Sequence, residues 1–298
     1  MNILVIGQGG REHAIAWKLQ QSEKAAEVFV APGNGGTELE TGCTNVDISS
    51  NDFPMIKSFV EEKNIKLVVV GPEDPLVNGI KDYLSDSNVL VFGPDAKGAQ
   101  LEGSKIFSKE FLFENSIPTG EASFFSSSDK AIDHLEKSHF PIVLKADGLA
   151  AGKGVLVTSR LEEAKEWVKE VMEDSKFGVA GKNILIEECL FGTELSFMGI
   201  LTPQSFIPFE TSIDYKPLLE GNKGPNTGGM GCMSPSPFMN EDLKKNIVET
   251  VVKPTISGLK NKGINYYGFM YFGLMVKNNI SKVLEFNCRL GDPETQCL

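Results

Sequence analysis

Near the C-terminus, an alternating segment carries a carboxylate and an amide two residues apart. In Val283-Leu284-Glu285-Phe286-Asn287, a β-strand points Glu285 and Asn287 to the same face of its sheet, because successive side chains of a strand alternate. Carboxylate and amide oxygens are hard ligands that suit Mg²⁺ carrying a nucleoside triphosphate. Arg289 falls on the same face, where its charge can hold an anion. Alternating polar residues on a strand often simply face water, so the pattern needs support from elsewhere.

A glycine-rich segment over residues 145–154 gives that support. It is not a P-loop, because Gly148 and Gly152 are separated by three residues and Lys153 is followed by Gly154. We expect a glycine-rich flap between two antiparallel strands, with backbone N–H groups that close over phosphates. Lys145, at the end of the preceding strand, supplies a localised charge for the same phosphates. The alternative is a flexible hairpin with a surface lysine.

Two further segments are compatible with a nucleotide and a small anion. The backbone of residues 186–190 lies where a strand meets a connector and can pair with the edge of an adenine, and Glu194 can accept both ribose hydroxyls. The alternative is a pair of acidic residues that are simply solvated. Residues 224–231 hold four glycines with Pro225 and Asn226 between them, which suits a loop that wraps an anionic ligand with backbone amides. The alternative there is a disordered lid.

The N-terminal loop, residues 7–13, invites a dinucleotide-binding interpretation that fails. Glu12 occupies the third glycine position of the dinucleotide fingerprint, and the next strand ends at Pro32 without an acidic residue for a ribose. The loop still places backbone N–H groups at a helix N-terminus, which suits a lone phosphate. The alternative is a purely structural strand–helix turn, and we assign no catalytic role to His13.

The composition is that of an ordinary globular protein with an acidic balance. The chain has 298 residues, 41% hydrophobic and 23% charged, enough for two or three domains. The formal net charge of −11, without a compensating basic stripe, argues against nucleic-acid binding. Five scattered cysteines without C-x-x-C spacing favour a reduced compartment and no zinc site. Without a signal-like segment or a membrane-length apolar run, we expect a cytoplasmic protein that does not engage a membrane.

Three regions follow from the pattern of elements, which predicts an α/β protein. Residues 1–102 alternate apolar strands with helices and Gly/Pro turns, which indicates a parallel α/β sheet with ligands at the strand ends. Residues 120–189 form a compact lid unit, and residues 103–119 with 190–298 form a central domain. We expect single helices over 95–115 and 241–262, with strands over 195–201, 269–276 and 282–288. Residues 214–238 are the longest irregular segment, typical of a functional loop.

Taken together, these residues resemble the ATP-grasp ligases, and among them the phosphoribosylamine–glycine ligase (glycinamide ribonucleotide synthetase) family. The resemblance spans the whole chain and rests on long strings of low degeneracy. These are residues 7–13, 31–34, 71–77, 101–105, 145–154, 224–231 and 285–296. It implies an N-terminal parallel α/β (pre-ATP-grasp) domain, followed by an ATP-grasp fold with a small lid subdomain.

The reaction that the resemblance implies belongs to purine biosynthesis. ATP, glycine and 5-phosphoribosylamine give ADP, phosphate and glycinamide ribonucleotide, by way of glycyl phosphate. Carboxylates are poor acyl donors, so phosphorylation supplies a leaving group and catalysis is mainly positioning and charge neutralisation. The sequence offers no persuasive side-chain nucleophile, and this chemistry needs none.

The resemblance also implies a role for individual residues. Residues that hold ATP are Lys105, Lys145, Gly152, Lys153, Gly154, Glu187, Leu190 and Glu194. Metal ligands, for Mg²⁺ or Mn²⁺, are Glu285 and Asn287. Residues on the glycine and acyl-phosphate side are Arg289, Gly291, Asp292, Asp214 and Lys216. Residues that line the phosphoribosylamine side are Gly9, Gly10, Asn34 and Glu73. We expect a monomer.

Two departures from the family's pattern bear on these expectations. The family reads Asp-His-Lys-Arg ahead of the Gly-Pro-Asn loop, where this chain has Asp214-Tyr215-Lys216-Pro217, which removes donors near the substrate anions. Family members also continue well past the residues that end here at Leu298, so the resemblance implies a fragment or a shortened form with incomplete support for its ligands. The alternatives are a related ATP-grasp ligase with a changed acceptor and a nucleotide-binding chain without turnover.

Overall fold

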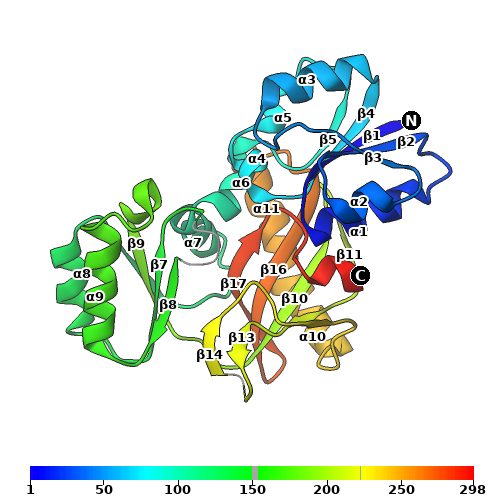
Figure 1. The fold of residues 1–298 in the computed structure, drawn as a ribbon. Helices are drawn as coiled ribbons and strands as arrows, with labels where there is room; N and C mark the ends of the chain where they lie inside the picture. Colours follow the sequence, from blue (N-terminus) through cyan, green and yellow to red (C-terminus); the bar gives the residue numbers. More distant parts are fainter. Residues whose placement is uncertain (150–153, 222) are drawn as a thin grey trace.

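The computed structural model describes residues 1–149, 154–221 and 223–298, and it is built around three sheets (Figure 1). The first is a five-stranded parallel sheet with strand order β3-β2-β1-β4-β5. Its strands are β1 (Asn2–Gly7), β2 (Glu27–Pro32), β3 (Cys43–Asn45), β4 (Ile65–Val70) and β5 (Leu90–Phe92). Its helices are α1 (Gly10–Gln20), α2 (Gly35–Leu39), α3 (Phe53–Glu62), α4 (Glu73–Val77) and α5 (Ile80–Tyr83). The predicted parallel α/β sheet is confirmed.

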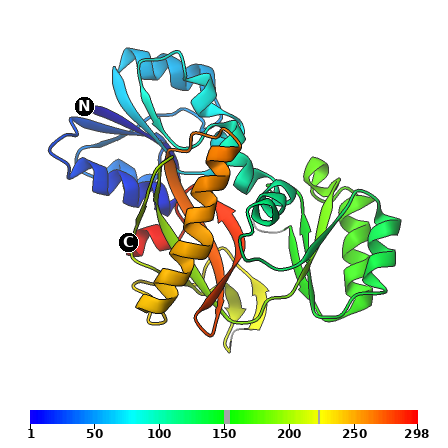
Figure 2. The same ribbon diagram turned by 180° about the vertical axis from the view of Figure 1, so that it is seen from behind.

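The central sheet is antiparallel, with strand order β11-β10-β16-β17. Its strands are β10 (Thr193–Leu201), β11 (Phe206–Pro208), β16 (Gly268–Lys277) and β17 (Ile280–Asn287). A long helical segment runs across the back of this sheet (Figure 2). It consists of α10 (Glu241–Ile247), the π-helical turn η2 (Val248–Val252) and α11 (Lys253–Asn261). The widened turn interrupts the single helix expected here, because Pro254 has no N–H to donate to the carbonyl four residues earlier.

The single helix expected over residues 95–115 is wrong. The structure has two helices, α6 (Ala96–Gly103) and α7 (Lys105–Glu114), separated by Ser104 in an extended conformation (φ −131°, ψ 119°). The Ser104 hydroxyl accepts the Phe107 N–H at 3.0 Å, which caps the second helix, and donates to Asp147 Oδ1 at 2.8 Å. The break therefore starts α7 at Lys105, beside the site described below.

The lid is a four-stranded sheet with strand order β6-β9-β7-β8 and helices on one face. Its strands are β6 (Ala122–Phe125), β7 (Ile142–Ala146), β8 (Val155–Thr158) and β9 (Ile184–Glu188). Helices α8 (Ser128–Leu135) and α9 (Leu161–Met172), with the 3₁₀ turn η1 (Gly178–Gly181), complete it. The lid has a separate hydrophobic core, in which Leu144, Ile184 and Ile186 pack with Ala131 and Trp167 of the helices. The antiparallel pairing of β7 with β8 confirms the predicted strands on either side of the flap.

The segment expected to be irregular, residues 214–238, contains short strands. Strand β12 (Ile213–Asp214) pairs with β15 (Cys232–Met233), and β13 (Pro217–Leu219) pairs with β14 (Lys223–Asn226). Strand β12 also contacts β10, so the β12–β15 ladder lies beside the central sheet.

The last element is a 3₁₀ turn, η3 (Glu294–Cys297), which lies beside α1 of the N-terminal domain (Figure 1).

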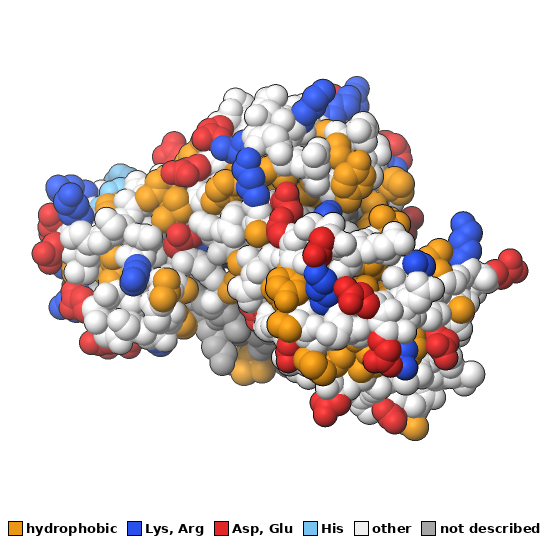
Figure 3. Space-filling model, turned by 90° about the horizontal axis from the view of Figure 1, so that it is seen from above, with side chains coloured by type: hydrophobic (Ala, Val, Ile, Leu, Met, Phe, Trp, Pro, Cys, Tyr) orange, Lys and Arg blue, Asp and Glu red, His pale blue; other side chains and the backbone are white. Residues whose placement is uncertain are grey.

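The described residues include no helix long and apolar enough to cross a membrane. Acidic and basic side chains are interspersed over the face seen from above, with apolar side chains in small groups between them (Figure 3).

Candidate active site

The carboxylate and amide of β17 lie on one face of the central sheet, as the alternation predicts. On the neighbouring strand β16, Gly273 is the partner of Glu285 and Tyr271 is the partner of Asn287. Burial raises the pKa of Glu285, but nearby cations outweigh this effect and lower that pKa to about 2. The cations are Lys105, Lys145, Lys216 and Arg289. Its side chain is 36% exposed, so the ionised carboxylate stays within reach of a ligand.

Lys145 lies between the lid and this face of the central sheet. Its Nζ contacts Glu187 Oε2 at 3.0 Å and donates to the Leu284 carbonyl at 3.2 Å, so it links β7 and β9 of the lid to β17. Lys105, at the start of α7, approaches Glu285 Oε2 with its Nζ at 3.8 Å. Two lysines from different elements therefore converge on Glu285, in a place suited to a polyphosphate.

The inner face of the lid sheet combines these charges with apolar side chains. Residues paired directly across antiparallel strands share a face, which places Lys145 with Leu185, and Glu187 with Val143. Val155, which pairs with Lys145, is exposed on this face. The face therefore offers an apolar wall beside a cation. Two other residues expected at the nucleotide lie nearby, Leu190 just after β9 and Glu194 near the start of β10.

Two residues of the expected flap, Gly152 and Lys153, are outside the described residues. Gly154 is buried at the start of β8, and its carbonyl accepts the Ala146 N–H at 2.8 Å. This hydrogen bond fixes the C-terminal end of the flap on strand β7.

Asp214 and Lys216 lie together beside Glu285. Lys216 Nζ approaches Asp214 Oδ2 at 3.3 Å and Glu194 Oε2 at 3.6 Å, and all four side chains line one small pocket with Tyr271. The other carboxylate oxygen of Asp214, Oδ1, is buried without a hydrogen-bond partner in the described chain. Burial raises the pKa of Asp214; Lys216 opposes that shift and Glu294 adds to it. A buried acceptor without a donor is rare and marks a place for a ligand donor.

The two residues that depart from the family pattern lie next to this pair. The Tyr215 side chain is half exposed, and its backbone N–H and C=O pair with Gly231 and Met230 at 3.0 and 2.8 Å. Pro217 begins strand β13. Tyr215 thus connects the Gly-rich loop to Asp214 through its backbone, a contact that any side chain permits.

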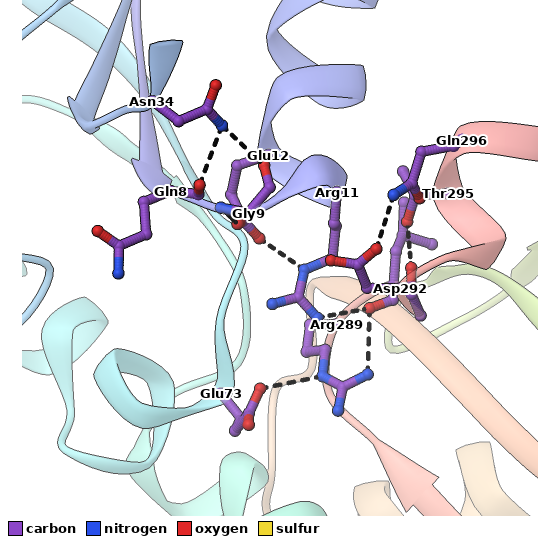
Figure 4. A network of polar contacts seen from close by, with 12 residues as sticks. Gln8, Gly9, Arg11, Glu12, Asn34, Glu73, Arg289, Asp292, Thr295 and Gln296 are labelled. Carbon is purple, nitrogen blue, oxygen red and sulfur yellow. Dashed lines mark hydrogen bonds and ion pairs between the residues drawn. The ribbon is translucent and has the colours of Figure 1, made fainter. Parts of the chain in front are cut away.

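Arg289 joins the N-terminal sheet to the central sheet (Figure 4). Its Nε donates to Glu73 Oε2 at 3.2 Å, its Nη2 contacts Glu102 Oε1 at 3.0 Å and its Nη1 donates to the Leu290 carbonyl at 3.2 Å. The Leu290 carbonyl also accepts Arg11 Nη1 at 3.0 Å. Glu102 is buried and accepts the Cys288 N–H at 2.7 Å as well. The guanidinium is therefore fixed from three directions.

A larger pocket, of about 610 Å³, opens at the C-terminal ends of the parallel strands. Gly9, Arg11, Asp74 and Asp292 are among its lining residues. Gly10 lies at its edge, where an added Cβ would come within 2.7 Å of Gln296 Nε2. An added Cβ at Gly291 would overlap the carboxyl group of Glu294, which is buried. Gly10 thus leaves room for Gln296 of η3, and Gly291 leaves room for the Glu294 side chain.

Asn34 braces the loop that borders this pocket. Its Oδ1 caps α2 by accepting the Gly36 and Thr37 N–H groups at 2.7 and 3.0 Å. Its Nδ2 donates to the Gln8 and Gly9 carbonyls at 2.9 and 3.3 Å (Figure 4). The side chain thus holds the Gly9 turn in place from behind.

Several residues of this region were missed by the sequence reasoning. Glu102 and Glu294 are buried acids whose partners lie far along the chain, so local spacing gives no signal for them. Ser196, Tyr271 and Glu294 form one hydrogen-bonded cluster beside Asp214. Lys109 was detectable, because it follows Lys105 by four residues and therefore shares its helix face.

Comparison with known proteins agrees with this architecture over nearly the whole chain. The model of the phosphoribosylglycinamide synthetase N domain matches residues 1–102, and that of the ATP-grasp (A) domain of the same synthetase matches residues 103–295. The chain belongs to the phosphoribosylglycinamide synthetase family. The phosphoribosylamine–glycine ligases of Haemophilus influenzae and Escherichia coli K12 are each 48% identical to it over 297 residues. These alignments cover 99% of this chain and 69% of each relative.

Solved structures of one ligase of this family and of a more distant ligase share the fold. The phosphoribosylamine–glycine ligase of Thermotoga maritima matches with a TM-score of 0.85 at 34% identity, covering 99% of this chain and 71% of that chain. The D-alanine–D-alanine ligase of Bacillus anthracis in complex with ATP matches with a TM-score of 0.64 at 17% identity, over 98% and 87% of the two chains. At that identity the second match shows the fold alone. The expected α/β domain followed by an ATP-grasp fold is confirmed.

Proposed function

We propose that this chain ligates glycine to 5-phosphoribosylamine at the expense of ATP, giving glycinamide ribonucleotide, ADP and phosphate. The observation that carries the proposal is the placement of two lysines at Glu285, between the lid and the central sheet. Lys105 Nζ lies 3.8 Å from Glu285 Oε2, and Lys145 Nζ donates to the carbonyl of the preceding residue at 3.2 Å. The 48% identity to phosphoribosylamine–glycine ligases over 99% of the chain supports the choice of reaction. It favours this ligase over a related enzyme with a changed acceptor and over a nucleotide-binding chain without turnover.

In the first step, one carboxylate oxygen of glycine attacks the γ-phosphorus of ATP, ADP leaves and glycyl phosphate forms. Lys105 and Lys145 neutralise the phosphates and hold them in line with the attacking oxygen. Because the Glu187 carboxylate is engaged by Lys145, the adenine would pair with the backbone of the connector after β9, near Leu190. Glu194 would accept the ribose hydroxyls.

Glu285 and Asn287 fit a divalent metal ion. The carboxylate is ionised and the amide lies on the same face, and both oxygens are hard ligands. Among the described residues no three His, Cys, Asp or Glu side chains form a complete metal-binding cluster. The remaining ligands would therefore be phosphate oxygens and water. Bound Mg²⁺ or Mn²⁺ would neutralise negative charge on the phosphates.

Asp214 would receive the ammonium group of glycine. Its unpartnered Oδ1 is the acceptor that such a donor needs, and Lys216, which contacts Oδ2, lies close enough to meet the glycine carboxylate or the acyl phosphate. Arg289 would stabilise the same anion with the guanidinium hydrogens that its three protein contacts leave over.

In the second step, the amine of 5-phosphoribosylamine attacks the carbonyl carbon of glycyl phosphate. The phosphate leaves, the amine loses a proton and the amide bond forms. The pocket beside Gly9 and Asp292 has room for the ribose phosphate, and the N-terminus of α1 presents backbone N–H groups to its anion. Glu73 would contribute by fixing Arg289 between the two substrates.

The test is ADP release by the chain with Mg²⁺, ATP and glycine, with and without freshly generated 5-phosphoribosylamine. The proposal predicts release that requires both glycine and the phosphoribosylamine. ADP release that is independent of phosphoribosylamine, or its absence under all conditions, would contradict the proposal.

A further inference from the structure

Lys109 is a buried cation that the proposed mechanism leaves without a task. It lies on α7, and only 3% of the residue is exposed. Its Nζ donates to Thr119 Oγ1 at 2.7 Å and to the Gly120 carbonyl at 3.3 Å, and it contacts Glu187 Oε2 at 3.4 Å. The ammonium group therefore joins three parts of the molecule: α7, the connector that leads into the lid, and strand β9 of the lid.

The same connector is fixed to the central sheet. Thr119 Oγ1 donates to the Val283 carbonyl at 2.7 Å, and the Val283 N–H donates to the Pro118 carbonyl at 2.7 Å. Lys109 thus lies where the chain passes from the central domain into the lid, and the lid approaches α7 at this point (Figure 1). Its contact to Glu187 joins α7 to β9.

Glu187 Oε2 is shared between two lysines, at 3.4 Å from Lys109 Nζ and 3.0 Å from Lys145 Nζ. One carboxylate neutralises only one of two ammonium groups, so Glu187 and the two lysines together carry a net positive charge. Without Lys109, Glu187 would pair with Lys145 alone and would neutralise more of the Lys145 charge. Lys145 is the lysine that faces the proposed phosphate site.

We propose that Lys109 is a positioning residue that shares Glu187 with Lys145 and so leaves the Lys145 charge free for the phosphates of a bound nucleotide. The inference deepens the proposed function, since it rests on Lys145 meeting those phosphates. Burial lowers the pKa of Lys109; Glu187 opposes this shift and Lys145 adds to it. A neutral side chain of the same length would fill the same space without the cost of desolvating a charge. Packing alone therefore does not explain why residue 109 is a cation.

The experiment compares nucleotide affinities of the full chain and its variants by calorimetry, without turnover. In Lys109→Met, the Kd for ADP is expected to rise about tenfold, while those for AMP and adenosine change less than about twofold, because the lost charge acts on the distal phosphates. Lys109→Arg keeps the cation and is expected to stay within about threefold of the wild type for ADP.

A double variant and a matched control complete the series. In Lys109→Met/Glu187→Gln, residue 187 no longer carries a charge that neutralises Lys145, so the ratio of the Kd for ADP to that for AMP is expected to return toward the wild-type ratio. Lys282→Met removes a neighbouring but exposed contact between β17 and the lid, Lys282 Nζ to Glu188 Oε2 at 3.3 Å. It is expected to leave all affinities unchanged.

A Lys109→Met variant that weakens ADP, AMP and adenosine alike would overturn the inference and leave Lys109 a packing residue of the lid. Unchanged affinity for ADP would overturn it too, as would a double variant no better than the single one. The series measures no turnover, so a wild-type chain that binds ADP but forms no glycinamide ribonucleotide would count against the proposed function alone.

Discussion

At the scale of single residues, the charges around each carboxyl group of the site decide whether it is ionised. Glu285 stays ionised because four nearby cations lower its pKa, whereas burial, with a smaller contribution from Glu294, raises the pKa of Asp214 against the opposing effect of Lys216. The two carboxylates therefore suit different ligands. Glu285 suits a metal ion at any working pH, and Asp214 suits a donor that it can hold only when deprotonated.

Glu285→Gln is expected to lower metal-dependent turnover at least about tenfold, because the amide offers a weaker ligand to a hard cation. Since the pKa of Glu285 is about 2, its metal binding should not titrate between about pH 6 and pH 9. The measurement is kcat/KM against Mg²⁺ concentration, with exposed Glu249→Gln as the control. An unaltered Mg²⁺ dependence in Glu285→Gln would sink the metal assignment.

Asp214→Asn is expected to raise the KM for glycine about tenfold or more and to change the KM for ATP less than about twofold. A raised pKa means that the carboxyl group takes up a proton at a higher pH than an ordinary aspartate. In the wild type, the KM for glycine should therefore rise as the pH falls through that pKa. The check is the pH profile of this KM; the variant should lack the rise, and an identical profile in both proteins contradicts the role.

The residue-level pattern was partly readable from the sequence. Glu285 and Asn287 share a face because side chains alternate on any strand, and that expectation needed no tertiary information. Glu102 could not be found in this way, because its importance comes from Cys288 and Arg289, which only the fold brings to it.

At the scale of elements, the breaks in helices matter more than their lengths. Residues 95–115 contain no proline and no two adjacent glycines, so their pattern predicts one helix. In the structure, Ser104 instead has an extended conformation and caps α7. The propensity of serine for the N-cap position is a signal, but a weak one. The hydrogen bond from the Ser104 hydroxyl to Asp147 joins segments far apart in the sequence, so local patterns do not show it. The π-helical turn before Pro254 is a similar case.

Ser104→Ala is expected to destabilise the chain by about 1 kcal/mol, because it removes the N-cap of α7 and the donor to Asp147. Ser58→Ala serves as the control, because Ser58 is an exposed residue of α3 whose hydroxyl donates only to the Pro54 carbonyl. Chemical denaturation of both variants measures the difference. Equal midpoints for the two would show that the hydroxyl of Ser104 contributes nothing to the break.

At the scale of the whole molecule, two sets of contacts join the three sheet units at the site. Arg289 and Arg11 tie the N-terminal sheet to the turn after β17, and the lysines of α7 and β7 tie the lid to the central sheet. The order of an N-terminal domain followed by an ATP-grasp domain was expected from the resemblance, and the family models confirm it. The contacts between the units could not be expected from the sequence, because they depend on how separately folded sheets pack together.

Glu73→Gln is expected to raise the KM for 5-phosphoribosylamine about fivefold while the KM for ATP changes less than about twofold. Burial raises the pKa of Glu73, but the Arg289 charge outweighs this and lowers it, so the variant removes an ionised partner from the domain contact. In this variant the contact between Arg289 and Glu102 remains, so the guanidinium stays near the proposed site of the acyl phosphate. A larger effect on ATP than on phosphoribosylamine would argue against this coupling.

The most direct test of the central claim follows oxygen. With glycine labelled by ¹⁸O in its carboxylate, attack on the γ-phosphorus makes one labelled oxygen the bridge of glycyl phosphate, and that oxygen leaves with the phosphate when the amine attacks. We predict one ¹⁸O in each phosphate released during synthesis of glycinamide ribonucleotide, measured by mass spectrometry. Product formed with unlabelled phosphate would contradict an acyl-phosphate mechanism, and with it the roles given to Lys105, Lys145 and Arg289.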